Sequence, residues 1–236
     1  MILPIRTDLR LRHTPWMNYT LIAANVLIFA YTGGGTSSGS PIGWEYMLFP
    51  SDPKWWQFFT YQFLHAGWLH LIGNMVFLYI FGNSLEDRFG PLGYLAFYLA
   101  GGVFAGIGHI LTSSAPVLGA SGAIAGVMGA YLAWFPWVRV RTVIVLGYIP
   151  LWPRIPAAPV LLLWFSLQFQ FDGDTSVAWV AHVVGFGFGV IAGLVARSDG
   201  DFERSLQMQH RRVRAAHSNR KAEMAQAKEA RAGLAE

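Results

Sequence analysis

A few polar residues lie within long apolar stretches of the sequence. Two of these residue types, serine and histidine, can together perform nucleophilic catalysis. A serine hydroxyl becomes a nucleophile when a neighbouring base takes its proton, and a histidine ring can be that base. Burial favours the neutral imidazole, which is the form that a base needs. Taken singly, each has a plainer interpretation: a serine in a Gly/Ala-rich helix packs, and a buried histidine hydrogen-bonds to a neighbouring helix. The set comprises His65, His70, Asn74, His109, Ser121 and His182.

Regularly spaced glycines indicate which of these residues meet. Three glycines recur every four residues just after His182, so His182 lies on the same helical face as they do. Two more glycines with the same spacing follow Ser121 directly. Small residues four apart let helix backbones approach closely, so packing of these two faces would bring Ser121 Oγ within reach of His182. The glycines are Gly122 and Gly126 in one segment, and Gly185, Gly189 and Gly193 in the other.

Composition identifies the class of protein that must position these residues. The 236 residues are 54% hydrophobic and only 13% charged, against roughly 25% charged in an average protein. Half of the 30 charged residues lie after residue 196, so residues 1–196 carry only 15. This excludes an ordinary soluble enzyme, and the absence of cysteine excludes a disulfide scaffold. The sequence pI is near 9.5, but the basic residues form no surface for reading nucleic acid, so no nucleic-acid partner is expected.

Six apolar segments are long enough, with their flanks, to cross a bilayer. We therefore predict an all-α polytopic membrane protein, a bundle of six transmembrane helices. Residues 1–15 would be the cytoplasmic N-terminus, 16–197 the six-span membrane domain that holds the candidate catalytic residues, and 198–236 a basic cytoplasmic tail, either a surface helix or disordered. The apolar stretch 141–155 contains two prolines, so it is predicted to be a re-entrant or interfacial connection. The predicted spans are 16–31, 62–82, 91–111, 117–136, 156–171 and 177–196.

The charges orient this bundle. Six spans place both termini on one side, and with the N-terminus inside, 16 of the 17 Lys and Arg residues lie on the inner side. That distribution follows the positive-inside rule, and short loops of this kind suit a bacterial plasma membrane with cytoplasmic termini. Residues 1–31 also resemble a signal peptide, but no small-x-small cleavage site follows them. The aromatic-rich first outer loop, 32–61, is expected to lie on the outer leaflet.

Four of the polar residues are predicted to lie at a similar depth. The second, fourth and sixth spans all run from outside to inside. At 1.5 Å per residue, Ser121 would lie about 8 Å and His182 about 12 Å along their spans. His70 and Asn74 lie in the outer half of the second span and, four residues apart, share one helical face. Three separate helices thus bring polar groups to one level near the outer surface.

With these motifs in place, the sequence resembles the rhomboid family of intramembrane serine proteases. Residues 119–122 read Gly-Ala-Ser-Gly, which is similar to the family's GxSG motif. The spacing His65-x4-His70-x3-Asn74 looks like the motif of the family's second helix. The spacing His182-x2-Gly185-x3-Gly189 looks like that of the sixth. The three motifs occur in the right order and each in its own predicted span.

The resemblance implies a role for each residue. Ser121 would be the nucleophile and His182 the general base of a dyad with no acidic third member. The Ser121 backbone N–H, His70 and Asn74 would stabilise the oxyanion. Gly119, which has no side chain, would leave room for the substrate beside the backbone. Gly122, Gly185 and Gly189 would allow close helix packing. No cofactor and no metal are expected, since no HExxH motif or carboxylate pair lies in a span.

Two positions depart from the family's pattern. The family often has Trp-Arg in the first outer loop, whereas here Trp56 precedes Gln57, which concerns the anchoring of the loop. Some members carry an aromatic residue four positions after the serine that stacks on the histidine, whereas this chain has Ala125. This departure concerns the exact orientation of His182 and not its expected role.

The implied substrates are single-span membrane proteins within the bilayer, cut near their outer end after local unwinding. They would enter beside the fifth span, whose inner end holds Pro156 and Pro159, and the outer loop 171–176 would form a cap. Two other functions stay open: a catalytically silent relative that binds membrane clients, and a small transporter or channel. The sequence specifies no oligomeric state.

Overall fold

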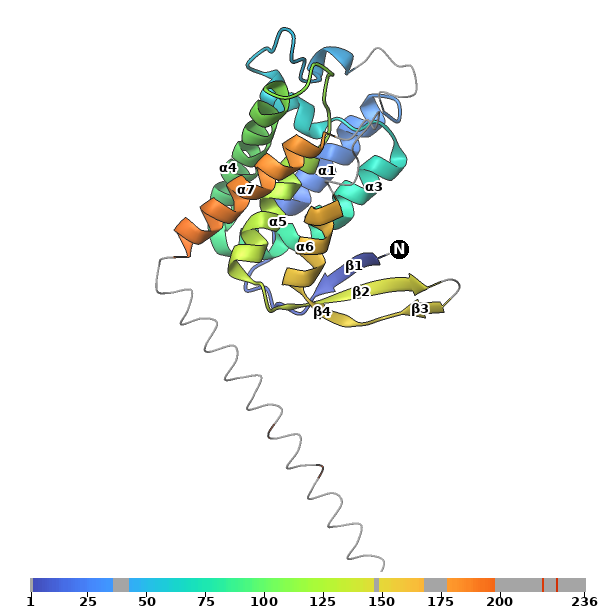
Figure 1. Cartoon of the computed structure of the whole chain (residues 1–236), viewed down its shortest axis with the longest axis vertical. Helices are drawn as coiled ribbons and strands as arrows, with labels where there is room; N and C mark the ends of the chain where they lie inside the picture. The colour runs from blue at the N-terminus through green and yellow to red at the C-terminus, as the bar shows by residue number, and fades with distance from the viewer. Residues whose placement is uncertain are drawn as a thin grey trace, which may run out of the picture. The chain divides into compact units, whose positions relative to one another are not determined.

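Long apolar stretches of the chain form helices, which satisfy their own backbone hydrogen bonds, around one central helix (Figure 1). The computed structural model describes residues 2–35, 43–146, 149–167 and 178–197, together with Ser218 and Met224. Residues 1–195 form one compact unit and residues 196–236 a second. The elements are β1 (Ile2–Thr7), α1 (Trp16–Tyr31), the 3-10 helix η2 (Trp44–Tyr46), α2 (Gln57–Thr60), the 3-10 helix η3 (Tyr61–Phe63), α3 (Trp68–Phe77), the π-helix η4 (Leu78–Gly82), α4 (Asn83–Ile110), α5 (Ser121–Trp134), β2 (Arg139–Leu146), β3 (Ile149–Leu151), β4 (Arg154–Pro156), α6 (Ala157–Leu167) and α7 (Trp179–Ala196).

Each of the six predicted spans contains a helix, with shifted limits. Among the described residues, two helical runs are long and apolar enough to cross a membrane, Trp68–Ile110 and Trp179–Ala196. The first run bends at Gly90, whose φ of 70° is outside the helical region, so its two limbs correspond to the spans predicted at 62–82 and 91–111. Three further apolar helices are shorter: Trp16–Tyr31, Ser121–Trp134 and Ala157–Leu167. The count of six spans therefore stays a prediction.

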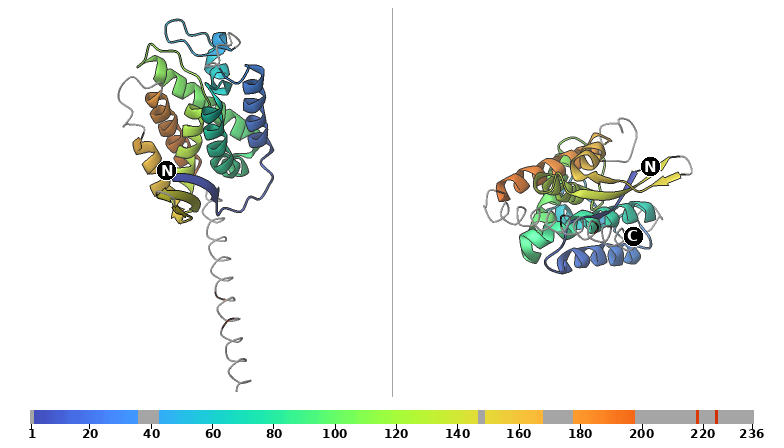
Figure 2. Two further views of the ribbon diagram at one scale, coloured as in Figure 1. Left: turned by 90° about the vertical axis from the view of Figure 1, so that its right-hand side faces the viewer. Right: turned by 90° about the horizontal axis from the view of Figure 1, so that it is seen from below.

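A four-stranded antiparallel sheet corrects the all-α prediction. Strand β2 pairs with β1 on one side and with β3 and β4 on the other. Val140 and Thr142 are buried whereas Arg139 and Arg141 are exposed, the alternation expected of a strand with one covered face. The strand-forming pattern was obscured in the sequence by Pro150 and Pro153. Figures 1 and 2 show the sheet at one end of the helical bundle, where β4 leads directly into α6.

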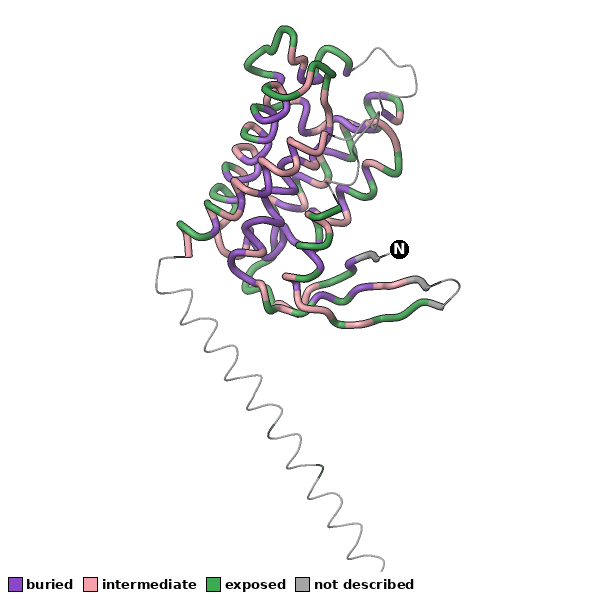
Figure 3. The backbone as a smooth tube through the Cα atoms, viewed as in Figure 1, coloured by how far each residue is buried: buried purple, intermediate pink, exposed green. Residues whose placement is uncertain are grey.

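Helix α5 is the centre of the bundle. All residues from Gly122 to Tyr131 are buried, and the burial map shows this helix as a continuous buried segment (Figure 3). Its glycines lie against α7: a Cβ atom at Gly185 or Gly189 would overlap the carbonyl oxygen of Gly122 or Gly126, respectively. Backbone therefore touches backbone along this pair of helices, which fixes the separation of the residues above it.

Two adjacent acidic residues at the start of α4 hold the beginning of α1. The buried Glu86 carboxylate accepts the backbone N–H groups of Met17 (3.0 Å) and Asn18 (2.6 Å). These are unpaired donors in the first turn of α1, where a negative charge is also favoured by the helix dipole. Asp87 accepts the backbone N–H of Arg12 at 2.8 Å and pairs with the Arg12 guanidinium at 3.1 Å. Hydrogen bonds to charged carboxylates thus connect the start of α4 to the beginning of α1 and the residues before it.

Candidate active site

Ser121 is the first residue of α5 and follows the connecting segment 117–120. The segment is anchored where Val117 pairs with Leu48 and where the Gly119 N–H donates to the Tyr61 carbonyl at 2.9 Å. The helix therefore begins four residues later than predicted, and the depth derived for Ser121 from the helix start at 117 is wrong. The position near one end of the bundle is retained.

Gly119 is the residue that lets this segment pass beside α3. Its φ is 124°, in the region that glycine adopts without strain. A Cβ at this position would lie 2.8 Å from Cε1 of His70. A side chain is therefore excluded both by the backbone conformation and by the ring that Gly119 touches.

His182 lies in the first turn of α7 and reaches Ser121 across the glycine contact. Its Nε2 atom is 2.7 Å from Ser121 Oγ, a hydrogen-bond distance. The His182 N–H donates to the Ala178 carbonyl at 3.3 Å, so the residue belongs to the regular start of the helix. A hydroxyl bonded to a ring nitrogen in this way is the arrangement from which a base can take the serine proton.

His70 presents a hydrogen-bond donor to the same space. Its Nδ1 atom accepts the Ala66 N–H at 3.4 Å, so in the neutral ring the proton is on Nε2. Nε2 lies 3.0 Å, and Ser121 Oγ 3.7 Å, from the point that a Gly119 Cβ would occupy. The donor and the hydroxyl therefore flank one small volume.

Asn74, one turn after His70 on α3, supplies a second donor. It is buried, and its Nδ2 atom has no hydrogen-bond partner among the residues that the structure describes. A buried amide without a partner is costly, and this one is available to donate a hydrogen bond to a bound group.

The start of α5 adds backbone donors. The first N–H groups of a helix have no partner within the helix, and the helix dipole places partial positive charge there. The residue before Ser121 is Ala120, whose side chain makes no capping hydrogen bond. The Ser121 N–H therefore points from an uncapped helix end, where an oxyanion would be stabilised.

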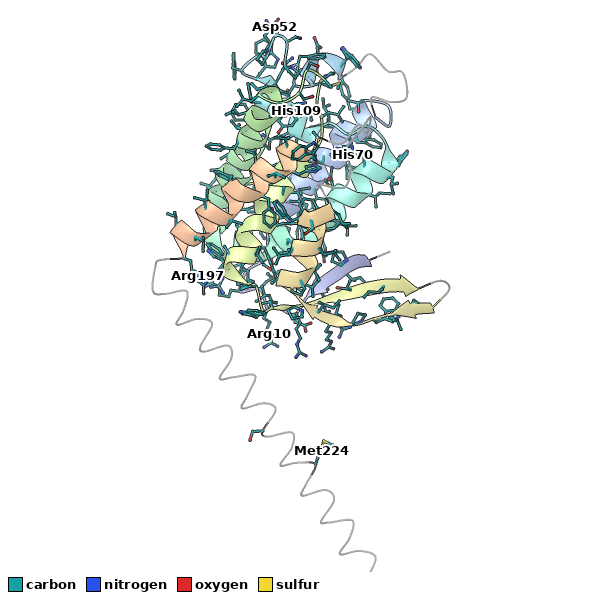
Figure 4. The ribbon with its side chains drawn as sticks, viewed as in Figure 1. Arg10, Asp52, His70, His109, Arg197 and Met224 are labelled. Carbon is teal, nitrogen blue, oxygen red and sulfur yellow. The ribbon has the colours of Figure 1, made fainter. Side chains whose placement is uncertain are left out.

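All of these polar groups line one cavity of about 980 Å³. Its walls come from α3, the segment before α5, α5 itself, Trp164 of α6 and the start of α7. His109 also lines it, with Nε2 2.8 Å from the Ala115 carbonyl oxygen. In Figure 4, His70 and His109 lie toward one end of the bundle and Arg10 at the other. The predicted residues in the wall are His70, Asn74, Gly119, Ser121, Gly122 and His182.

Three candidate residues from the sequence lie outside the cavity wall. Gly185 and Gly189 are buried in the contact between α5 and α7, further along α7 than His182. His65 precedes α3 instead of belonging to the second span, because residues 64–67 connect η3 to α3. Its buried ring packs edge-on against His70, with ring centroids 5.1 Å apart.

Sequence reasoning missed Trp164, the aromatic neighbour of His182. Its ring lies on α6, 5.9 Å from the His182 ring between centroids and tilted by 44°. Ala125, where some family members carry an aromatic residue, is fully buried among helices. An aromatic side chain in the fifth apolar segment was the available signal, but nothing in the spacing linked it to His182.

Gln57 anchors the first outer loop. Its side-chain oxygen accepts the Lys54 N–H at 3.1 Å, and its amide donates to the Glu45 carbonyl at 3.0 Å. The loop is thus held by a neutral amide at the position where the family often has arginine. The cap predicted at 171–176 and nearly all of the tail predicted at 198–236 lie outside the described residues.

Comparison with known proteins finds one family along most of the helical region. A protein-family model described as "Rhomboid domain" matches residues 52–199, more than half of the chain. "Rhomboid-like protein 11, chloroplastic" of Arabidopsis thaliana is 38% identical over 106 residues, 42% of this chain. "Putative rhomboid protease YdcA" of Bacillus subtilis is 32% identical over 126 residues, 52% of this chain. "Rhomboid protease GlpG" of Yersinia pestis is 32% identical over 141 residues, 58% of this chain.

The similarity covers a part of each relative. The aligned regions span 38%, 58% and 46%, respectively, of these three proteins. The GlpG match is the longest of the three in this chain.

Proposed function

The chain belongs to the rhomboid family of membrane proteins, and on that premise we propose that it is an intramembrane serine endopeptidase with a dyad of Ser121 and His182. The observation that carries the proposal is the 2.7 Å contact between Ser121 Oγ and His182 Nε2 inside a cavity that also exposes His70 and Asn74. A nucleophile, a base and convergent donors are the parts that acyl transfer requires.

The geometry supports a two-step reaction. Ser121 Oγ attacks the scissile carbonyl carbon while His182 Nε2 takes the hydroxyl proton. The negative charge that forms on the carbonyl oxygen is stabilised by the Ser121 N–H, His70 Nε2–H and the Asn74 amide. His182 then gives its proton to the leaving amine as the peptide C–N bond breaks. Water, deprotonated by His182, then attacks the acyl carbon. The acyl–Oγ bond breaks, the new carboxyl terminus leaves, and His182 returns the proton to Ser121 Oγ.

The placement of the cavity supports cleavage near one membrane face. In our proposal six spans leave both termini in the cytoplasm, so that the cavity opens toward the outer face. The substrate is a single-span membrane protein whose helix unwinds there, because a helical peptide carbonyl is engaged in hydrogen bonds and shielded from attack. A bacterial plasma membrane fits this arrangement.

We further propose that substrates enter between α3 and α6. Cavity-lining residues Leu69 and Phe77 belong to α3, and Trp164 belongs to α6. The Phe77 and Trp164 rings touch, with centroids 6.4 Å apart. Separation of these two rings would open the cavity to the bilayer, where a substrate helix resides.

Cleavage of a tagged single-span test protein by the purified chain tests the proposal. We expect product from the wild type and none from Ser121→Ala or His182→Ala. Ser166→Ala is the matched control, since Ser166 is exposed on α6 and its hydroxyl donates to the Leu162 carbonyl of its own helix, so this variant should cleave normally. A wild type that binds the test protein without cleaving it would instead support the silent client-binding relative.

A further inference from the structure

Three arginines stand in a row across the sheet. In the strand register, Arg141 of β2 is directly opposite Arg6 of β1 on one side and Arg154 of β4 on the other. Residues directly opposite in an antiparallel pair share one face of the sheet, with Cβ atoms about 4.5–5.5 Å apart. All three side chains are exposed. The row therefore concentrates three positive charges on one face, remote from Ser121.

Such a row is unfavourable unless an anion accompanies it. Like charges placed directly opposite destabilise a sheet, and arginine does not relieve the repulsion by losing its proton. Among the described residues, the ion pairs include Arg12–Asp87, His13–Asp87 and Lys54–Asp52. None of these pairs involves an arginine of the row.

The row borders a cavity of about 550 Å³ whose lining also includes residues of α1, η4 and the start of α4. Arg6, Arg141 and Arg154 line it together with a fourth arginine, Arg10, and one carboxylate, that of Asp8. The helical wall includes two tyrosines of α1 and η4, Tyr19 and Tyr79, whose rings stack with centroids 6.2 Å apart. The cavity thus joins a strongly cationic side to an aromatic side.

Aromatic residues mark this end of the bundle as a membrane–water interface. Trp16 at the start of α1, Trp137 before β2 and Trp152 between β3 and β4 are each at least 68% exposed. Exposed tryptophan favours the headgroup level of a bilayer. Figure 4 shows Arg10 at this end, opposite to His70. The arginine row therefore lies at headgroup depth, where the abundant anion is a lipid phosphate.

We propose that Arg6, Arg141 and Arg154 bind the phosphate group of an anionic phospholipid in the leaflet opposite Ser121. The planar guanidinium group donates two parallel hydrogen bonds to phosphate oxygens, which suits it to this ligand. The acyl chains would lie along the helices that carry Tyr19 and Tyr79. This lipid site is separate from the proposed proteolysis and does not depend on it.

Native mass spectrometry of the full chain in detergent tests the site. We titrate phosphatidylglycerol and phosphatidylcholine and count the lipid retained. The wild type should retain phosphatidylglycerol preferentially, and Arg141→Gln should weaken that retention about fivefold, since an arginine near the surface contributes ~1 kcal/mol. Arg139→Gln is the matched control: it removes the same charge from the same strand, but Arg139 faces Pro156 and does not line the cavity. It should change retention less than twofold.

A second variant and a competition measurement complete the test. Arg154→Gln should reproduce the loss, which keeps the test valid if Arg141→Gln does not fold, and thermal unfolding reports folding for each variant. Inorganic phosphate is titrated as a competitor. Equal losses in the Arg139 and Arg141 variants would overturn the site in favour of a general charge effect. Binding of inorganic phosphate as tight as that of the lipid would overturn the assignment to a phospholipid.

Discussion

At the scale of single residues, His182 depends on a neighbour from another helix. Trp164 lies against its ring, where Ala125 offers no aromatic surface. We propose that Trp164 orients His182. Trp164→Ala should then lower kcat about tenfold, since misorienting a base removes part of the 10²–10⁴-fold gained from it, whereas loss of the proposed gate contact with Phe77 should change KM. Trp164→Phe should restore most of the activity, because it keeps a ring beside His182.

The control for Trp164 is its neighbour on α6. Phe165 packs on Phe186 with centroids 4.7 Å apart and is not part of the cavity wall. Phe165→Ala removes a similar ring, so it should lower thermal stability with little change in kcat of the folded protein. Equal losses of kcat in both alanine variants would show that Trp164 acts through packing alone.

Two buried asparagines should separate chemistry from stability. Asn74 Nδ2 has no partner in the described structure, whereas Asn18 Nδ2 donates to Asn83 at 2.7 Å and to the Leu78 carbonyl at 3.0 Å. Asn74→Ala should cost about 10²-fold in kcat, as loss of an oxyanion donor does elsewhere, with a nearly unchanged Tm. Asn18→Ala should lower the Tm by several degrees and leave kcat of the folded protein unchanged. Kinetics and thermal unfolding of both variants check this; a Tm loss at Asn74 would contradict its proposed role.

At the scale of helices, the α5–α7 contact sets the distance between Ser121 and His182. A Cβ at Gly189 would overlap the Gly126 carbonyl oxygen, whereas a Cβ at Gly187 meets open space. Gly189→Ala should therefore push α7 outward, lower the Tm by several degrees and remove most of the activity. Gly187→Ala should retain activity and gain stability by about 0.5–1 kcal/mol, the advantage of alanine in a helix. Activity and thermal unfolding of the pair distinguish close packing from a general intolerance of substitution in α7.

The junction of α1 with α4 should give the fold an acid-sensitive component. Burial raises the pKa of Asp87, but hydrogen bonds from the His13 and Arg12 backbone and the Arg12 guanidinium outweigh it and hold the pKa below its ordinary value. A lowered folded-state pKa means that this stabilisation is present above the unfolded value of ~3.9 and is lost as the pH falls through the folded value. Asp87→Asn should lower the Tm by a few degrees at neutral pH and reduce the additional loss in acid. Asp52→Asn, at an exposed pair with Lys54, should follow the wild-type pH profile of Tm.

A feature of the fold or of the site could be predicted from the sequence only where its contacts follow from residues close together in the chain. The meeting of Ser121 with His182 could, because glycines four apart define a helix face whatever the rest of the chain does. The start of α5 at Ser121 could not, since it depends on Val117 pairing with Leu48, which is distant in the sequence. The sheet escaped prediction because its prolines interrupt an apolar run that already resembled an interfacial segment. The contacts of Trp164 and Glu86 could not be predicted either, because their partners come near only when the chain folds.

At the scale of the whole molecule, the proposed orientation makes the two ends chemically distinguishable. The chain contains no cysteine, so single-cysteine variants report their own position. Asp52 and Arg10 lie at opposite ends of the bundle (Figure 4). An N-terminus inside, as the positive-inside rule predicts, places residue 52 outside after one span and residue 10 in the cytoplasm.

Labelling of intact cells with a membrane-impermeant thiol reagent checks this orientation. Asp52→Cys should react in intact cells, and Arg10→Cys should react only after the membrane is opened. Both should react equally in detergent, which controls for local accessibility. Reaction of Arg10→Cys in intact cells would reverse the orientation, moving the Ser121 cavity to the cytoplasmic side and the arginine row to the outer leaflet. The orientation matters for substrates because it decides which end of a single-span protein meets the nucleophile.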